Sequence, residues 1–139
     1  MTRINIINPQ ELTDQHLIAE YREIFMVGGS LNRTLNSKIG YKKSKVPKKF
    51  TLNGGHVYFF YNKGKYLYKR YQEIVQEMKN RGFNPDPNRK FNTKIFKTNN
   101  LYNDWLPTIE DQKIIKNRIA ERIAKKPNWY RFTKVVTND

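Results

Sequence analysis

The 139-residue sequence contains no cysteine. This absence excludes disulfide cross-links, thiolate nucleophiles and cysteine-ligated zinc. No apolar run approaches the roughly 20 residues that a membrane-spanning helix needs. The chain opens with polar residues, including Arg3 and Asn5, and this is not the pattern of a signal peptide. We therefore expect a cytoplasmic protein that makes no use of a membrane.

Groups that commonly carry catalysis are also scarce. The only histidines are His16 and His56, which lie far apart in the sequence. There is no glycine-rich phosphate-binding loop, and no carboxylates with metal-site spacing occur in the basic part of the chain. A metal-dependent nuclease is therefore poorly supported, and we expect no metal site.

Positive charge is abundant, with 27 Lys and Arg against 12 Asp and Glu and a formal net charge of +15. No acidic residue occurs from Ile24 to Gln72, whereas acids gather near the start of the chain. An ordinary soluble surface mixes both signs. The segregation favours a polyanionic partner, most commonly nucleic acid. The acid-free stretch contains the basic residues Arg33, Lys38, Lys42, Lys43, Lys45, Lys48, Lys49, Lys63, Lys65, Lys69 and Arg70.

Apolar periodicity predicts three helices. The first runs from Asp14 toward Asn36 with Thr13 as N-cap, and Gly28 and Gly29 are expected to break or kink it. The second covers about 65–80 and ends at Gly82. The third follows a capping box at 108–111 and runs to about Lys125 with a stripe of Ile115, Ile119 and Ile123. The chain length is that of one domain, so we expect a mainly α, compact single domain, 1–139, of three helices with long loops.

The segments between these helices are less regular. Residues 37–54 read as an extended basic loop, and 83–107 read as irregular because of Pro85, Pro87 and Pro107. The run His56–Tyr61 fits either a short strand or the start of a buried helix. After Pro127 the tail is aromatic and basic.

One unusual nucleophile is available at the start of the chain. Removal of Met1 would leave the α-amine of Thr2 free. An α-amine has a pKa near 8, and neighbours such as Arg3 and Arg22 would lower it, so part of it is unprotonated at neutral pH. Such an amine can attack an electrophilic sugar carbon and form an imine.

The first predicted helix places three titratable side chains on one face. His16, Glu20 and Glu23 lie at i, i+4 and i+7. One interpretation is that a carboxylate here transfers protons next to a cationic DNA site. The other is that Glu20 and Glu23 are solvated or pair with Arg22 and Arg33.

Several motifs, in order along nearly the whole chain, resemble the phage endonuclease V family of pyrimidine-dimer DNA glycosylases with abasic-site lyase activity. The middle loop and residues 85–105 match poorly. The matching motifs are Met1–Asn5, Glu11–Leu12, Asp14–Leu17, Ala19–Glu23, Gly55–Val57, Phe59–Tyr61, Arg81–Asn84, Pro127 and Trp129–Tyr130.

The resemblance implies a three-helix domain whose N-terminus inserts between helices. It implies that the Thr2 amine attacks the sugar carbon and that Glu23 assists imine formation and β-elimination. It also implies that no cofactor is needed and that the partner is duplex DNA, kinked and with one base extruded. We expect a monomer. The DNA-contacting residues implied by the resemblance, or added for their charge, are Arg3, Gln15, His16, Arg22, Arg33, Arg118, Arg122, Trp129, Tyr130 and Arg131.

Two departures from the family pattern bear on the substrate. Met26 stands where family members carry an arginine that contacts phosphate, and the tail after Tyr130 is altered. The leading hypothesis is a glycosylase and lyase acting on ultraviolet-damaged duplex DNA. The same amine chemistry on another modified base, or on abasic sites only, stays open. So does a DNA-binding module of the same fold without catalysis.

Overall fold

The three long helices expected from the sequence are all present in the computed structural model, which describes residues 3–134. They are α1 (Asp14–Leu35), α3 (Gly64–Asn80) and α5 (Ile109–Lys125). The 3-10 turn η1 (Pro9–Glu11) precedes α1, and the short helices η2 (Lys43–Lys45), α2 (His56–Phe59) and α4 (Lys94–Thr98) lie between the long ones. No strand occurs in the described part of the chain, so the prediction of a mainly α fold is confirmed.

The ends of the long helices follow the capping signals in the sequence. The Thr13 side chain accepts the His16 N–H at the start of α1, and Thr108 and Asp111 form the expected capping box of α5. Gly82 ends α3 with a φ of +88°. There the Gly82 N–H donates to the Lys79 carbonyl and the Phe83 N–H donates to the Met78 carbonyl. This pair of bonds is a Schellman motif.

Three sequence expectations are corrected or settled by the structure. The α1 helix continues through Gly28 and Gly29, so the expected break is wrong. Residues 83–107 are not irregular throughout, because α4 forms there around the buried ring of Phe96. The run starting at His56 is a single helical turn, α2, and not a strand.

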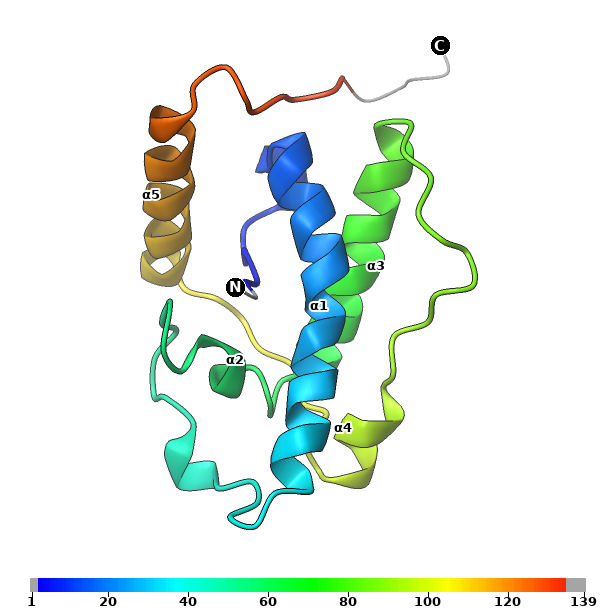
Figure 1. Ribbon diagram of the computed structural model, residues 1–139, viewed down its shortest axis with the longest axis vertical. Coiled ribbons are helices and arrows are strands. Elements are labelled where there is room, and N and C mark those ends of the chain that lie inside the picture. The colour runs from blue at the N-terminus through cyan, green and yellow to red at the C-terminus, as the bar shows by residue number, and fades with distance from the viewer. Residues whose placement is uncertain (1–2, 135–139) are drawn as a thin grey trace.

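The core lies where α1 packs against α3, with α2 and α4 closing it below (Figure 1). The α1 stripe predicted from the sequence, Leu17, Tyr21 and Ile24, is buried there. The inward side of α5 adds Ile115 and Ile119. No helix within residues 3–134 is both long and apolar enough to cross a membrane.

The N-terminal segment, residues 3–7, has no regular secondary structure, yet it is almost wholly buried. Ile4, Ile6 and Ile7 all belong to the core. In Figure 1 this segment runs between α5 and α1, and hydrogen bonds tie it to both helices. Residues 3–7 therefore occupy the space between α1 and α5.

Candidate active site

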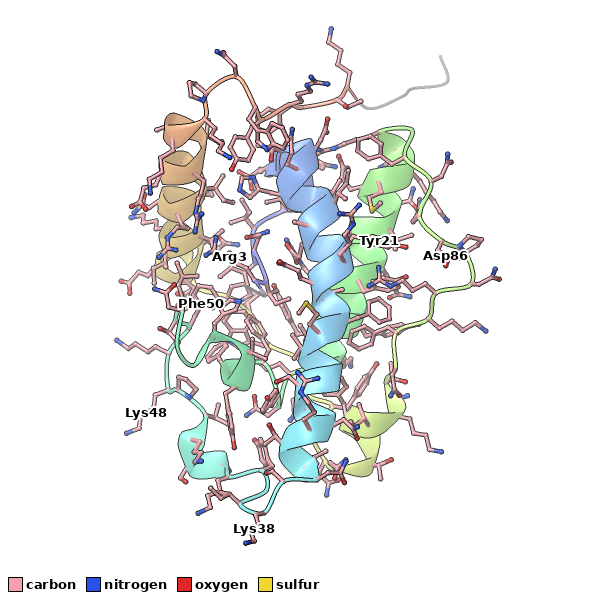
Figure 2. The ribbon with its side chains drawn as sticks, in the orientation of Figure 1. Arg3, Tyr21, Lys38, Lys48, Phe50 and Asp86 are labelled. Atoms are coloured by element: carbon pink, nitrogen blue, oxygen red, sulfur yellow. The ribbon has the colours of Figure 1, made fainter. Side chains whose placement is uncertain are left out.

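A cavity of about 230 Å³ opens between the N-terminal segment, α1, α5 and the C-terminal tail. In Figure 2 Arg3 lies in this space between α1 and α5. The cavity gathers residues that are up to 127 positions apart in the sequence. Its walls are formed by Arg3, Asn5, His16, Ala19, Glu23, Arg122 and Tyr130.

Glu23 forms the acidic wall of the cavity. Its Oε2 accepts a hydrogen bond from the backbone N–H of Arg3 at 3.2 Å. Burial raises the pKa of the Glu23 carboxyl, although the Arg3 N–H and the Arg3 charge act in the opposite direction. A carboxyl with a raised pKa in a cavity is a candidate for proton transfer.

The arginines of the cavity wall are Arg3 and Arg122, and Arg118 precedes Arg122 by one turn of α5 without lining the cavity. Burial, and then the charges of Arg118 and Arg122, lower the pKa of Arg3, because both α5 guanidinium groups repel its positive charge. Arg118 also pairs loosely with Glu121, with 3.7 Å between the Arg118 Nε and a carboxylate oxygen. An anion such as a phosphate placed among the three arginines would relieve their repulsion.

His16 closes the cavity together with the tail. Its ring stacks on Tyr130, with centroids 4.8 Å apart and planes at 7°. Its Nδ1 shares a hydrogen bond with the Thr13 hydroxyl at 2.6 Å. Burial, and then the nearby charges of Arg3 and Arg122, lower the pKa of His16, which favours the neutral ring at pH 7.

The start of α1 holds the tail in place. The Gln15 amide donates to the Trp129 carbonyl at 2.5 Å and accepts from the Arg131 N–H at 3.0 Å. Asp14 accepts from both the backbone N–H and the hydroxyl of Thr133. These bonds keep Tyr130 over the cavity, while the Trp129 ring remains 58% exposed beside it.

Within residues 3–134, the predicted site residues that do not line the cavity are Gln15, Arg22, Arg33, Arg118, Trp129 and Arg131. Arg22 is exposed on α1, and its carbonyl accepts from the Arg89 guanidinium. Arg33 is exposed in the last turn of α1, and Arg131 is exposed on the tail. Met26 is half exposed one helical turn beyond Glu23. Thr2 lies outside the described residues.

Glu20 has neither of the roles considered from the sequence. It is fully buried and binds Arg70 through both carboxylate oxygens, at 2.7 and 2.9 Å, rather than Arg22 or Arg33. Its spacing from His16 and Glu23 marked it as a neighbour of the site, but nothing in the sequence identified Arg70 as its partner.

Two residues of the cavity were missed by the sequence analysis. Ala19 lies between His16 and Glu23 on the α1 face, and its small side chain leaves room there. Asn5 is buried, and its Oδ1 is the one buried side-chain polar atom without a hydrogen-bond partner within residues 3–134. A helical-face argument applied to position 19 would have found Ala19, whereas no sequence signal marks Asn5.

No three His, Asp or Glu side chains gather in a metal-binding arrangement within the described residues. The polar groups of the cavity are instead one carboxyl, one imidazole, one amide, one phenol and the two guanidinium groups of Arg3 and Arg122. This set can exchange protons and hold phosphate. The helical fold and this basic cavity define a small α-helical protein with a site suited to a phosphate-bearing polymer.

The chain belongs to the pyrimidine dimer DNA glycosylase family, whose family model matches residues 1–91. The match covers the N-terminal segment, α1, α2 and α3, including Arg3, His16 and Glu23. Membership supports DNA glycosylase activity on pyrimidine dimers and DNA as the substrate. The α5 helix and the tail, which complete the cavity, lie beyond the matched residues.

Proposed function

We propose that this protein, acting as one domain over residues 1–139 and as a cytoplasmic monomer, is a DNA glycosylase with abasic-site lyase activity on ultraviolet-damaged duplex DNA. The Thr2 α-amine is the nucleophile and Glu23 assists. The observation that carries this proposal is the hydrogen bond from the Arg3 N–H to Glu23 in the wall of a basic cavity.

Chain connectivity links this bond to the nucleophile. The Arg3 nitrogen is bonded to the carbonyl carbon of residue 2, and standard bond lengths keep consecutive backbone nitrogens within about 4 Å. Because Glu23 lies 3.2 Å from the Arg3 nitrogen, a free amine on residue 2 is within about 8 Å of the carboxyl. This upper limit leaves the amine free to approach Glu23 to hydrogen-bond distance or through one water, the range that proton transfer needs.

The proposed reaction balances without a cofactor. The amine attacks C1′ of the damaged nucleotide, and the base leaves with the electrons of the glycosidic bond and takes a proton. The amine then loses a proton, the C1′–O4′ bond breaks, and O4′ is protonated as the C1′=N imine forms. Removal of a C2′ proton expels the 3′-phosphate by β-elimination, and water releases the amine. Glu23 is the proposed carrier of these protons.

The tail and the arginines support the proposed binding mode. Arg3 and Arg122 of the cavity wall, with Arg118 acting on Arg3 from α5, are the proposed phosphate-binding residues. The exposed Trp129 ring offers a flat surface on which an unstacked base can lie. We propose that the duplex is bound kinked with one base extruded, because this gives the amine access to C1′.

Borohydride reduction on an abasic duplex tests the amine chemistry, together with the intact mass of the N-terminus. Protein with a free Thr2 amine should give a stable adduct through residue 2. E23Q should give no strand cleavage while its DNA affinity is unchanged or higher, because the substitution removes a proton carrier and a charge that repels DNA. Equal loss of binding in E23Q would assign Glu23 a structural role.

Parallel incision of ultraviolet-irradiated, abasic and otherwise modified duplexes assigns the substrate. Cleavage of the irradiated duplex supports the dimer specificity that the family implies. Cleavage of the abasic duplex alone would leave only the lyase step. Binding without an adduct, by protein whose Thr2 amine is verified, would contradict the enzyme and support a DNA-binding module.

A further inference from the structure

Three consecutive backbone N–H groups of the N-terminal segment each donate to a different side chain. The Arg3 N–H donates to Glu23 at 3.2 Å, the Ile4 N–H to His56 Nε2 at 2.8 Å, and the Asn5 N–H to Glu20 Oε1 at 3.1 Å. Two of the acceptors come from α1 and one from α2. In a strand these donors would pair with a neighbouring backbone, but here side chains replace that ladder.

His56 can accept this bond only in one protonation state. Its Nδ1 donates to the Thr51 carbonyl at 2.8 Å, so the proton is on Nδ1 and Nε2 is free to accept from Ile4. The ring is 2% exposed and lies edge-on to Phe50 and Phe60, at 5.5 and 5.3 Å. The acceptor atom is therefore held in one place.

Glu20 is held just as firmly. Arg70 binds both of its oxygens, and the Arg70 guanidinium also donates to the carbonyl of Ile7. The Glu20–Arg70 pair thus binds the segment twice: Glu20 accepts from the Asn5 N–H, and Arg70 donates to the Ile7 carbonyl. A buried charge pair of this kind contributes little net stability compared with apolar packing, but it defines geometry.

We propose that His56, backed by the Glu20–Arg70 pair, is a positioning residue that sets where the N-terminal segment lies and so aims the residue-2 amine at the substrate. The proposal rests on the proposed function. An amine at the end of an irregular segment has no helix or strand to orient it, and reaction rates depend steeply on the position of the attacking atom. The Ile4 N–H is only two residues from that amine.

Two substitutions of His56 separate positioning from simple occupancy of the core. H56Q places an amide oxygen near the Nε2 position and can still accept from Ile4. H56N places its amide near Nδ1, so it can keep the bond to Thr51 but is too short to reach Ile4. F60L is the matched control, because Phe60 is fully buried against the same ring and makes no hydrogen bond to the segment.

The measurements are the single-turnover rate of borohydride-trapped adduct on an abasic duplex, the Kd for that duplex, and the Tm of each variant. We expect H56N to form adduct about tenfold more slowly, or slower still, with an unchanged Kd. H56Q should recover most of the rate. F60L should keep the wild-type rate even where its Tm falls as far as that of H56N.

Three results would overturn the inference. The first is an H56N rate of adduct formation equal to that of wild type. The second is an equal loss of rate in H56N and F60L that follows their loss of Tm. The third is a Kd of H56N that rises in proportion to its loss of rate. If H56N does not fold, H56L takes its place, because leucine fills the core but offers no acceptor to the Ile4 N–H. A wild-type rate in H56L would overturn the inference, and a rate about tenfold lower than that of H56Q would support it. Failure of the wild-type protein to form any adduct would instead contradict the proposed function itself.

Discussion

At the scale of single residues, the cavity depends on side-chain size as much as on charge. Ala19 is the one small side chain among larger polar groups, and it lies between His16 and Glu23 on α1. Because it is exposed to the cavity and outside the core, its size affects the space for substrate rather than the stability of the helix.

A19L should therefore lower incision of an irradiated duplex by about tenfold or more, because the added side chain displaces the sugar from the amine. Leucine is nearly as good a helix former as alanine, so the Tm should stay close to wild type. A19S is the control, since serine adds only one atom and should cut at nearly the wild-type rate. Equal rates for A19L and wild type would place the substrate elsewhere.

The arginines of α5 make a separate prediction about binding. R118A and R122A should each weaken binding to damaged and undamaged duplexes alike, and each should flatten the slope of log K against log salt by about one unit. Lys94 is the control, because it is exposed on α4, on the other side of α1 from α5 in Figure 1. An unchanged slope in R118A or R122A would remove that residue from the interface.

At the scale of elements, two glycines at helical positions have opposite requirements. Gly29 is exposed within α1, and a Cβ there would meet only the Arg33 guanidinium at 3.8 Å. Gly64 begins α3, and a Cβ there would lie 2.3 Å from the Phe96 ring. The glycine at 64 therefore allows α4 to pack closely against α3, whereas the one at 29 has no such role in packing.

G29A should raise the free energy of unfolding by about 0.5–1 kcal/mol, because alanine loses less backbone entropy in a helix. G64A should lower it by about 1–3 kcal/mol, because the buried Phe96 must move. Urea denaturation of both variants measures the two effects. A stable G64A would mean that α4 shifts without cost.

At the scale of the whole molecule, stability depends on pH through two imidazoles, the buried His56 and the partly buried His16. Burial lowers the pKa of both His16 and His56, so they stay neutral in the folded protein at pH values where the unfolded chain protonates them. The unfolded state then binds more protons, and the free energy of unfolding falls as the pH drops below the ordinary histidine pKa of about 6.5.

Denaturation with urea between about pH 5 and pH 8 should show this fall begin near pH 6.5. H56Q should show a shallower fall, because glutamine does not titrate. The lowered pKa of Asp14 acts only at more acidic pH, and the raised pKa of Glu23 acts with the opposite sign, since protonation stabilises the folded form. A free energy of unfolding that stays constant over this range would contradict the lowered pKa of His16 and His56.

Local signals determined much of this protein. The N-cap at Thr13, the capping box at Thr108 and the apolar stripe of α1 predicted the long helices, because hydrogen-bond capping and 3.6-residue periodicity act between neighbours in sequence. Net charge predicted an anionic partner, and the motif around Glu23 indicated the family to which the chain belongs.

Only the tertiary structure decided which distant groups meet. Glu20 pairs with Arg70 from α3, the Ile4 N–H finds His56 on α2, and Arg122 of α5 faces Glu23 of α1 across one cavity. The short helix α4 within residues 83–107 likewise depends on tertiary packing, because the Phe96 ring is buried in the core. Contacts of this kind depend on how whole helices pack, because buried donors, acceptors and charges must find partners wherever the fold brings them.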